Sequence, residues 1–181
     1  LNLLGTMAVA AYSVGNKINI VMEQGPIAIG SAMATYCAQN LGAGNIKRIR
    51  QGVKAALGWM VLYYIILGTA AGFFGKYLTY LFLSDNVEAI IGNVDVFLKI
   101  VSATGILLGV LCIYRNSVQG MGYGVASLAG GLVELIARSI VAAVSLHCGT
   151  FFVVCMAYPA AWLFAAIFFA GMYQGTEEPR H

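Results

Sequence analysis

The chain has 181 residues, of which 60% are hydrophobic and only 9% are charged, and its formal net charge is +3. Soluble domains carry about 25% charged residues, so this composition excludes an ordinary soluble domain and predicts an integral membrane protein. The basic residues lie between long apolar runs, where they are typical of topology signals rather than of a nucleic-acid-binding surface.

Two membrane helices are predicted at the start of the chain, separated by a short polar turn. An apolar run covers residues 1–14, and Gly15-Asn16-Lys17 is expected to close it. Its first turns are expected to be missing, as in a fragment. The second helix is predicted over residues 19–41, where Pro26 removes a backbone hydrogen bond and produces a kink. Glu23 is interpreted as an interfacial carboxylate near the outer end of this helix, with attraction of cations into an opening as the functional alternative.

A glycine-rich break and a basic cluster follow the second helix. Gly42-Ala43-Gly44 predicts a left-handed helix stop, and a third membrane helix is expected over residues 55–76. Between them, four basic residues are expected on an interfacial turn that faces the cytoplasm: Lys47, Arg48, Arg50 and Lys54.

Three more membrane helices are predicted in the remainder of the chain. Residues 77–85 suit an interfacial segment, with Ser84 or Asp85 capping a helix that runs to Tyr114 and contains a pairing of Asp95 with Lys99. Residues 115–124 are predicted to form a polar turn, followed by helices over residues 125–146 and 151–173.

The sequence thus predicts an all-α integral membrane fold, a six-helix bundle over residues 1–173 with a polar cytoplasmic tail at 174–181. Its even number of spans places both chain ends in the cytoplasm. Six basic residues then lie on or near the cytoplasmic side, the four of the cluster with Arg115 and Arg180, against Lys17, Lys76 and Lys99 on the other side.

Glu134 and Arg138 are the most unusual charged residues, because they lie one helical turn apart within an apolar helix. A lone charge at the centre of a membrane helix costs about 3 kcal/mol or more, so the two are expected to pair. One interpretation is a static ion pair that fixes the helix orientation. The other is a pair that lines a cavity and changes partners during a transport cycle, with Glu134 as a proton-sensitive switch.

Arg115 and Gln119 are candidates for a role in gating at the end of the fourth helix. Arg115 could cap backbone carbonyls, contact anionic lipid, or hold an inner gate closed through contact with the fifth helix. No combination of serine, histidine and aspartate suits a hydrolase, and His147 lacks further metal ligands. We therefore expect no enzyme activity, no metal and no cofactor.

Several segments together resemble the second lobe of the multidrug and toxic compound extrusion (MATE) transporters. They are Gly5 to Tyr12, Pro26 with Gly30-Ser31-Ala32, Gln39 to Asn45, Arg115 to Gly122, Gly131 to Arg138 and Tyr158 to Trp162. The resemblance covers essentially the whole chain and implies helices seven to twelve of a twelve-helix protein. It also implies a missing first lobe as partner, location in the cell membrane, and export of drug-like, often cationic compounds in exchange for protons or sodium ions.

The resemblance leaves the coupling ion open, because one branch of the family has an acidic residue where this chain has about Leu108. Met33, Tyr36 and Gln39 are candidates for lining the transport cavity, together with Met121 in the turn predicted over residues 115–124. Two alternatives remain. A lipid-linked saccharide flippase of the same superfamily would be expected to have a more basic cavity, and a membrane scaffold would not transport at all.

Overall fold

The fold is a bundle of long helices in a computed structural model that describes residues 5–82 and 87–177, and none of these residues forms a strand. The elements are α1 (Thr6–Gly42), α2 (Ile46–Tyr63), the π-helical turn η2 (Tyr64–Gly68), α3 (Thr69–Phe74), the 3-10 turn η3 (Gly75–Leu78), α4 (Thr79–Phe82), α5 (Val87–Gly120), α6 (Gly124–Cys148), α7 (Phe151–Cys155) and α8 (Ala157–Glu177). The predicted all-α class is confirmed. The expected caps Ser84 and Asp85 lie outside the described residues.

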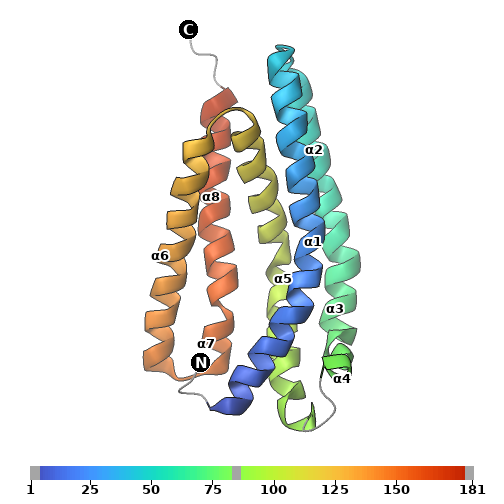
Figure 1. Ribbon diagram of the computed structural model, residues 1–181, viewed down its shortest axis with the longest axis vertical. Helices are drawn as coiled ribbons and strands as arrows, with labels where there is room; N and C mark the ends of the chain where they lie inside the picture. The colour runs from blue at the N-terminus through green and yellow to red at the C-terminus, as the bar shows by residue number, and fades with distance from the viewer. Residues whose placement is uncertain (1–4, 83–86, 178–181) are drawn as a thin grey trace.

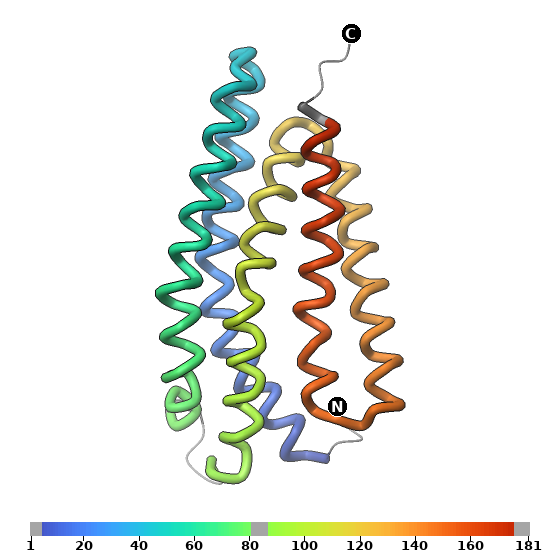
Figure 2. The backbone as a smooth tube through the Cα atoms, turned by 180° about the vertical axis from the view of Figure 1, so that it is seen from behind, coloured from blue at the N-terminus to red at the C-terminus, as the bar shows by residue number. Residues whose placement is uncertain are grey.

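These elements form five helical columns (Figure 1, Figure 2). Four are long and apolar enough to cross a membrane: Ile46–Leu78, Val87–Gly120, Gly124–Cys148 and Phe151–Gly175. The fifth column, α1, is long enough at 37 residues but is less apolar. α5 packs against α1 on one side and α8 on the other, and α6 packs mainly on α8.

α1 replaces the first two predicted helices, because the expected turn at Gly15-Asn16-Lys17 is wrong and the helix passes through it unbroken. Gly15 is a packing residue: a Cβ atom there would lie 2.6 Å from Cδ1 of Phe97 on α5. Asn16 is held by α8, since its side-chain oxygen accepts a hydrogen bond from the Tyr158 hydroxyl at 2.9 Å. These polar and small residues serve helix contacts, so they do not end the helix.

The five columns place the described start of α1 and the end of α8 at opposite ends of the bundle (Figure 1). Both chain ends were predicted on the same side, because a further turn was expected at residues 15–17. α8 continues to Glu177, so the first residues of the expected tail are helical. The loops after α1 and α5 lie together with the end of α8, and we call this end of the bundle the basic end, because Lys47, Arg48, Arg50 and Lys54 lie in the first turns of α2 there (Figure 1).

The same backbone turn ends α1 and α5. Gly44 has φ of 70°, and the amides of Gly44 and Asn45 donate to the carbonyls of Leu41 and Asn40 at 2.9 and 2.8 Å. This pair of bonds is a Schellman motif, which needs a left-handed residue and therefore favours glycine. The left-handed stop predicted from Gly42-Ala43-Gly44 is confirmed.

α5 ends in the same way one residue before Met121. Gly122 has φ of 95°, its amide donates to the Gln119 carbonyl at 3.0 Å, and the Tyr123 amide donates to the Val118 carbonyl at 3.2 Å. Arg115 and Gln119 are therefore helical, and the turn predicted over residues 115–124 is limited to the last few of them.

The Pro26 bend in α1 is stabilised by a side chain from the neighbouring column. Proline cannot donate to the carbonyl four residues earlier, which is that of Met22. The Tyr63 hydroxyl donates to this carbonyl at 2.8 Å. Gly25 makes room for the ring, because a Cβ atom there would lie 2.5 Å from Tyr63. The π-helical turn η2 begins at the next residue, Tyr64. α1 is visibly bent between its tilted first part and its upright second part (Figure 1).

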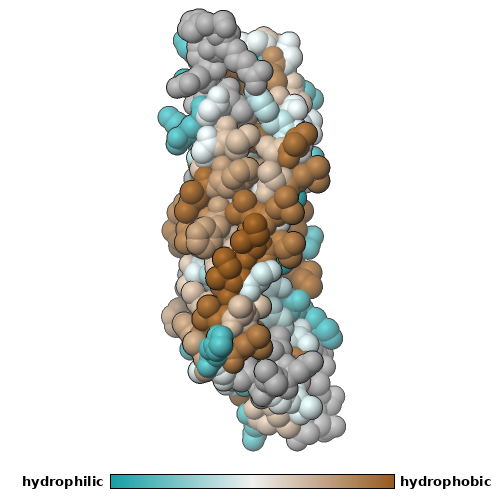
Figure 3. Space-filling model, turned by 90° about the vertical axis from the view of Figure 1, so that its left-hand side faces the viewer, coloured by the Kyte–Doolittle hydropathy of each residue, from teal (hydrophilic) through white to brown (hydrophobic). Residues whose placement is uncertain are grey.

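The outer face of α6 is strongly apolar. Leu128, Leu132 and Leu135 are each more than 60% exposed, and the space-filling view of this side shows hydrophobic side chains gathered across its middle (Figure 3). An apolar band of this kind is typical of contact with lipid or with further membrane helices.

Candidate functional site

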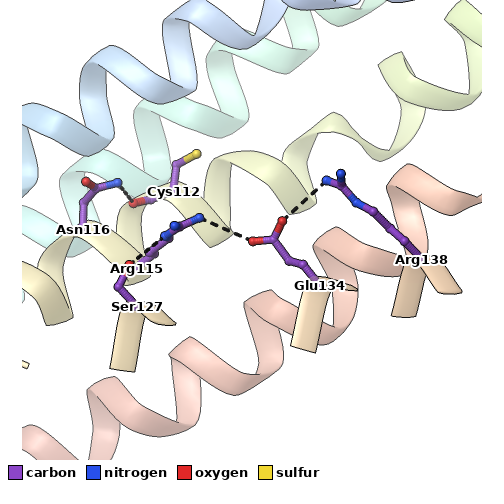
Figure 4. Close-up of polar contacts among 6 residues, drawn as sticks. All are labelled: Cys112, Arg115, Asn116, Ser127, Glu134 and Arg138. Atoms are coloured by element: carbon purple, nitrogen blue, oxygen red, sulfur yellow. Dashed lines mark hydrogen bonds and ion pairs between the residues drawn. The ribbon is translucent and has the colours of Figure 1, made fainter. Parts of the chain in front are cut away.

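Glu134 on α6 lies between two arginines, one from α5 and one from α6 (Figure 4). Its Oε1 accepts from Arg115 at 3.4 Å, and its Oε2 accepts from Arg138 at 3.5 Å. The predicted pairing of Glu134 with Arg138 is confirmed. The structure adds Arg115, which is 19 positions earlier in the chain than Glu134 and contacts the same carboxylate.

Arg115 is held in place by a second contact with α6. Its Nε donates to Oγ of Ser127 at 3.1 Å (Figure 4). Ser127, Glu134 and Arg138 share one face of α6, since spacings of seven and four residues correspond to two turns and one turn of a helix. The contact with the fifth predicted helix, on which one of the three roles considered for Arg115 depends, is present, and its role in gating stays a prediction. Asn116, its neighbour, bonds instead to the Cys112 carbonyl of its own helix at 2.8 Å.

Arg138 continues the connection to α8 and α1. Its guanidinium lies 5.4 Å from the centre of the Tyr158 ring, within the range of a cation–π contact. The Tyr158 hydroxyl donates to Asn16 on α1. We call Arg115, Ser127, Glu134, Arg138, Tyr158 and Asn16 the polar array. It connects α5, α6, α8 and α1.

The geometry of the polar array suits a carboxylate that can change partners. Tight charge-assisted hydrogen bonds between nitrogen and oxygen measure about 2.7–2.9 Å, so the 3.4 and 3.5 Å contacts of Glu134 are loose. The Glu134 side chain is only 17% exposed, whereas those of Arg115 and Arg138 are 40% and 47% exposed. Two positive groups face one negative group, which gives a formal net charge of +1.

A second carboxylate lies on α1. Glu23 is near the middle of this helix, so the interpretation as a residue at the outer helix end is wrong. Its Oε1 accepts from the Asn19 side chain at 2.7 Å, and Asn19 is only 3% exposed. The expected turn at residues 15–17 would have placed Glu23 four residues into a new helix, whereas it lies deep inside a long one.

The other predicted site residues lie apart from the polar array. Met33 is buried in the bundle core, and Tyr36 packs over Gly52 of α2 and donates to the Arg48 carbonyl at 3.0 Å. Gln39 and Gln119 are exposed. Met121 is buried in the turn after α5. A role for these residues in lining a transport cavity stays a prediction.

Sequence reasoning missed Tyr158 and Asn16 as members of the array. They are separated by 142 residues, and only the packing of α8 on α1 brings them together. Among the described residues, no three histidine, cysteine, aspartate or glutamate side chains are grouped in a way that could hold a metal ion.

Comparisons with known proteins agree with the resemblance found in the sequence. The model of the MatE family matches residues 1–144. A FAD transporter of Shewanella oneidensis is 25% identical over 129 residues, which cover 71% of this chain but only 28% of that protein. The chain therefore matches less than a third of the length of its curated relative. No solved structure gives a significant match. The chain belongs to the MatE family.

Proposed function

We propose that the chain forms part of a cation-coupled efflux antiporter, which exports small molecules across the cell membrane by alternating access. The polar array carries this proposal. A carboxylate held loosely between two arginines, in a helix that is otherwise apolar, is costly to maintain and is typical of ion and substrate pathways. Further membrane helices of the same protein would supply the second lobe, against which this one moves.

Glu134 is the switching residue of this mechanism. While it is ionised, it attracts Arg115 of α5 and Arg138 of its own helix. Binding of a proton or a sodium ion to the carboxylate neutralises it and releases both arginines. The contact between α5 and α6 is then weakened, and Arg138 can change its position over Tyr158 of α8. Binding of one ion would thus change contacts of three helices, α5, α6 and α8.

The orientation of the protein follows from the basic end. Its four clustered basic residues suit the cytoplasmic side, and the start of α1 then lies on the opposite side. A reporter fused after Gly44 should therefore be located in the cytoplasm, and an external location would contradict this orientation.

A second candidate for the substrate is an anion with the character of a flavin nucleotide. The relative from Shewanella oneidensis is a FAD transporter, and the two arginines of the polar array are groups that an anionic substrate could contact. A multidrug exporter would instead be expected to carry cationic dyes. The two candidates differ in substrate charge, so one assay separates them.

The test is transport by the full-length protein in proteoliposomes, with an imposed proton or sodium gradient and either a cationic dye or FAD as substrate. Glu134→Gln should abolish the dependence on the gradient while the protein still folds. Lys99→Gln is a matched control, because Lys99 pairs with Asp95 at 2.6 Å away from the array. Unchanged coupling in Glu134→Gln would overturn the switching role, and absence of any transport would favour a membrane scaffold.

A further inference from the structure

One exposed side of α1 is polar along most of its length. The residues on it are exposed and follow one another in steps of seven or four: Thr6, Ser13, Lys17, Gln24, Ser31 and Thr35. Steps of this size return to the same side of a helix, so the six residues form a row, which we call the polar line. It shares no residue with the polar array, so the switching mechanism does not account for it.

The polar line is long enough to cross a membrane. Thr6 and Thr35 are 29 positions apart in one unbroken helix, which corresponds to about 44 Å along the helix at 1.5 Å per residue. The hydrocarbon region of a bilayer is about 30 Å thick. The line is therefore a polar surface that continues from one side of the membrane to the other, rather than a local polar patch.

Gln24 lies at a depth where the neighbouring column is apolar on its outer side. Gly25, the next residue, packs against the ring of Tyr63. Beside Tyr63 in the sequence, Leu62 and Ile65 are 43% and 60% exposed. Large exposed apolar side chains in a membrane helix are typical of contact with lipid. At this depth, therefore, α1 exposes an amide where its neighbour exposes hydrocarbon.

The same contrast holds one turn closer to the basic end, at Ser31. The preceding residue, Gly30, would contact the Asn116 side chain of α5 through a Cβ atom at 2.7 Å. The residue before Asn116 bonds to Ser127 of α6, which places Ser127 at a similar depth. Leu128, next to Ser127, is 74% exposed. The middle of the polar line is thus level with residues of α6 that suit lipid.

The composition of the polar line argues against lipid and against a packed helix as its neighbour. Polar side chains within a membrane face protein or water, because hydrocarbon offers them no hydrogen bonds. Closely packed membrane helices meet at small residues, whereas the line includes the long polar side chains of Lys17 and Gln24. Ser13 and Gln24 bond to carbonyls of α1 itself, at 2.8 and 3.1 Å, so neither requires a partner helix. Water is the neighbour that suits all of these side chains.

We propose that the polar line faces water and forms one wall of the passage through which the solute crosses the membrane. This proposal rests on the transport function proposed above and names the surface along which the solute moves. Hydroxyl and amide side chains both donate and accept hydrogen bonds, and none of the six residues is acidic. The wall therefore suits a solute with several hydroxyl, carbonyl or amide groups, and any selection for a cation has to come from other residues.

The experiment measures how fast single cysteines of the full-length protein react with a positively charged methanethiosulfonate reagent, added to both sides of membrane vesicles. The exposed Cys148 is first replaced by serine. The thiolate is the reacting form of cysteine, and it forms in water but not in hydrocarbon. Gln24→Cys and Ser31→Cys should therefore react at least roughly tenfold faster than the matched controls on α6, Leu128→Cys and Leu132→Cys.

A second readout tests the passage itself. The group that the reagent attaches at residue 31 would occupy the passage, so treated Ser31→Cys should lose transport of FAD or of the cationic dye in proteoliposomes. The same treatment should leave transport by Leu128→Cys unchanged, because that residue is exposed on the apolar side of α6.

Two results would overturn the proposal. Equally slow labelling on the polar line and on α6 would mean that lipid or another helix covers the line. Fast labelling of Ser31→Cys with undiminished transport would mean that the line meets water outside the passage. If the unlabelled protein transports neither solute, the transport function fails and the passage with it, while the labelling rates still show whether the line faces water. The failure of the transport function and the failure of the wall are therefore distinguishable.

Discussion

The Tyr63 hydroxyl bonds to a carbonyl that has lost its partner within α1, so its removal has a predictable cost. Met22 would normally be bonded by the amide of residue 26, but Pro26 has no amide hydrogen. Tyr63 donates to this carbonyl at 2.8 Å from the neighbouring column. In Tyr63→Phe the ring can stay in place beside Gly25 while the carbonyl loses its donor.

The magnitude depends on whether α1 offers a substitute donor. Interhelical hydrogen bonds in membrane proteins contribute about 0.6 kcal/mol on average and about 1.7 kcal/mol at most, because broken bonds usually find other partners. Met22 has no such partner within its helix, so we expect a loss of about 1.5 kcal/mol in Tyr63→Phe, near the upper limit. Pro26→Ala restores the missing amide, so the same substitution in that background should cost only about 0.5 kcal/mol.

The assay is a double-mutant cycle of Tyr63→Phe and Pro26→Ala, with the free energy of unfolding measured by denaturant titration in bicelles. A coupling of about 1 kcal/mol between the two sites is expected, which is the difference between the two costs above. If Tyr63→Phe costs the same with and without the proline, the hydroxyl does not serve the orphaned carbonyl and the reasoning is refuted.

Three further predictions concern packing, capping and the polar array. A Cβ atom at Gly120 would lie 2.2 Å from a backbone oxygen of α1, so Gly120→Ala should destabilise the protein by about 3 kcal/mol in the same denaturant titration. A Cβ atom at Gly131 would have no neighbouring atom within 4 Å, so the control Gly131→Ala should be neutral or slightly stabilising. Asn45 caps α2 by accepting from a backbone amide at 3.1 Å, so Asn45→Ala should cost about 1 kcal/mol, and an unchanged unfolding midpoint would contradict this. Arg115→Gln should increase hydrogen exchange where α5 meets α6, because the ion pair of Arg115 with Glu134 joins these two helices. Arg138→Gln should not, because Arg138 and Glu134 are both on α6. Equal effects of the two substitutions would argue against a role of Arg115 in joining α5 to α6.

Features that depend on neighbouring residues in the sequence were predicted well. The glycines around Ala43 specify a left-handed stop by local backbone sterics alone, and the structure has it. Glu134 and Arg138 pair because a helix brings residues four apart together. Asp95 and Lys99 pair for the same reason, at 2.6 Å.

Features that depend on distant residues were not predicted. Gly15, Asn16 and Lys17 have the composition of a turn, and only the presence of Phe97 and Tyr158 shows that the first two of them serve helix packing instead. For Arg115 a contact with the fifth predicted helix was considered, but its partner Glu134 was not named, because that contact depends on how α6 folds back on α5. The error at this one turn changed the number of helices expected and the end of the bundle at which the start of α1 was expected (Figure 1).

The packing suggests why the array is placed on α6. α1 and α5 are in close contact at glycines, since a Cβ atom at Gly30 would lie 2.7 Å from the Asn116 side chain and one at Gly120 would lie against the α1 backbone. Such backbone-to-backbone packing resists movement. α6 buries few residues, packs mainly on α8 and reaches α5 through Arg115. If Glu134 switches as proposed, its change of charge would act on a helix that few buried residues hold in place, so the loss of one ion pair would have a large effect on its position.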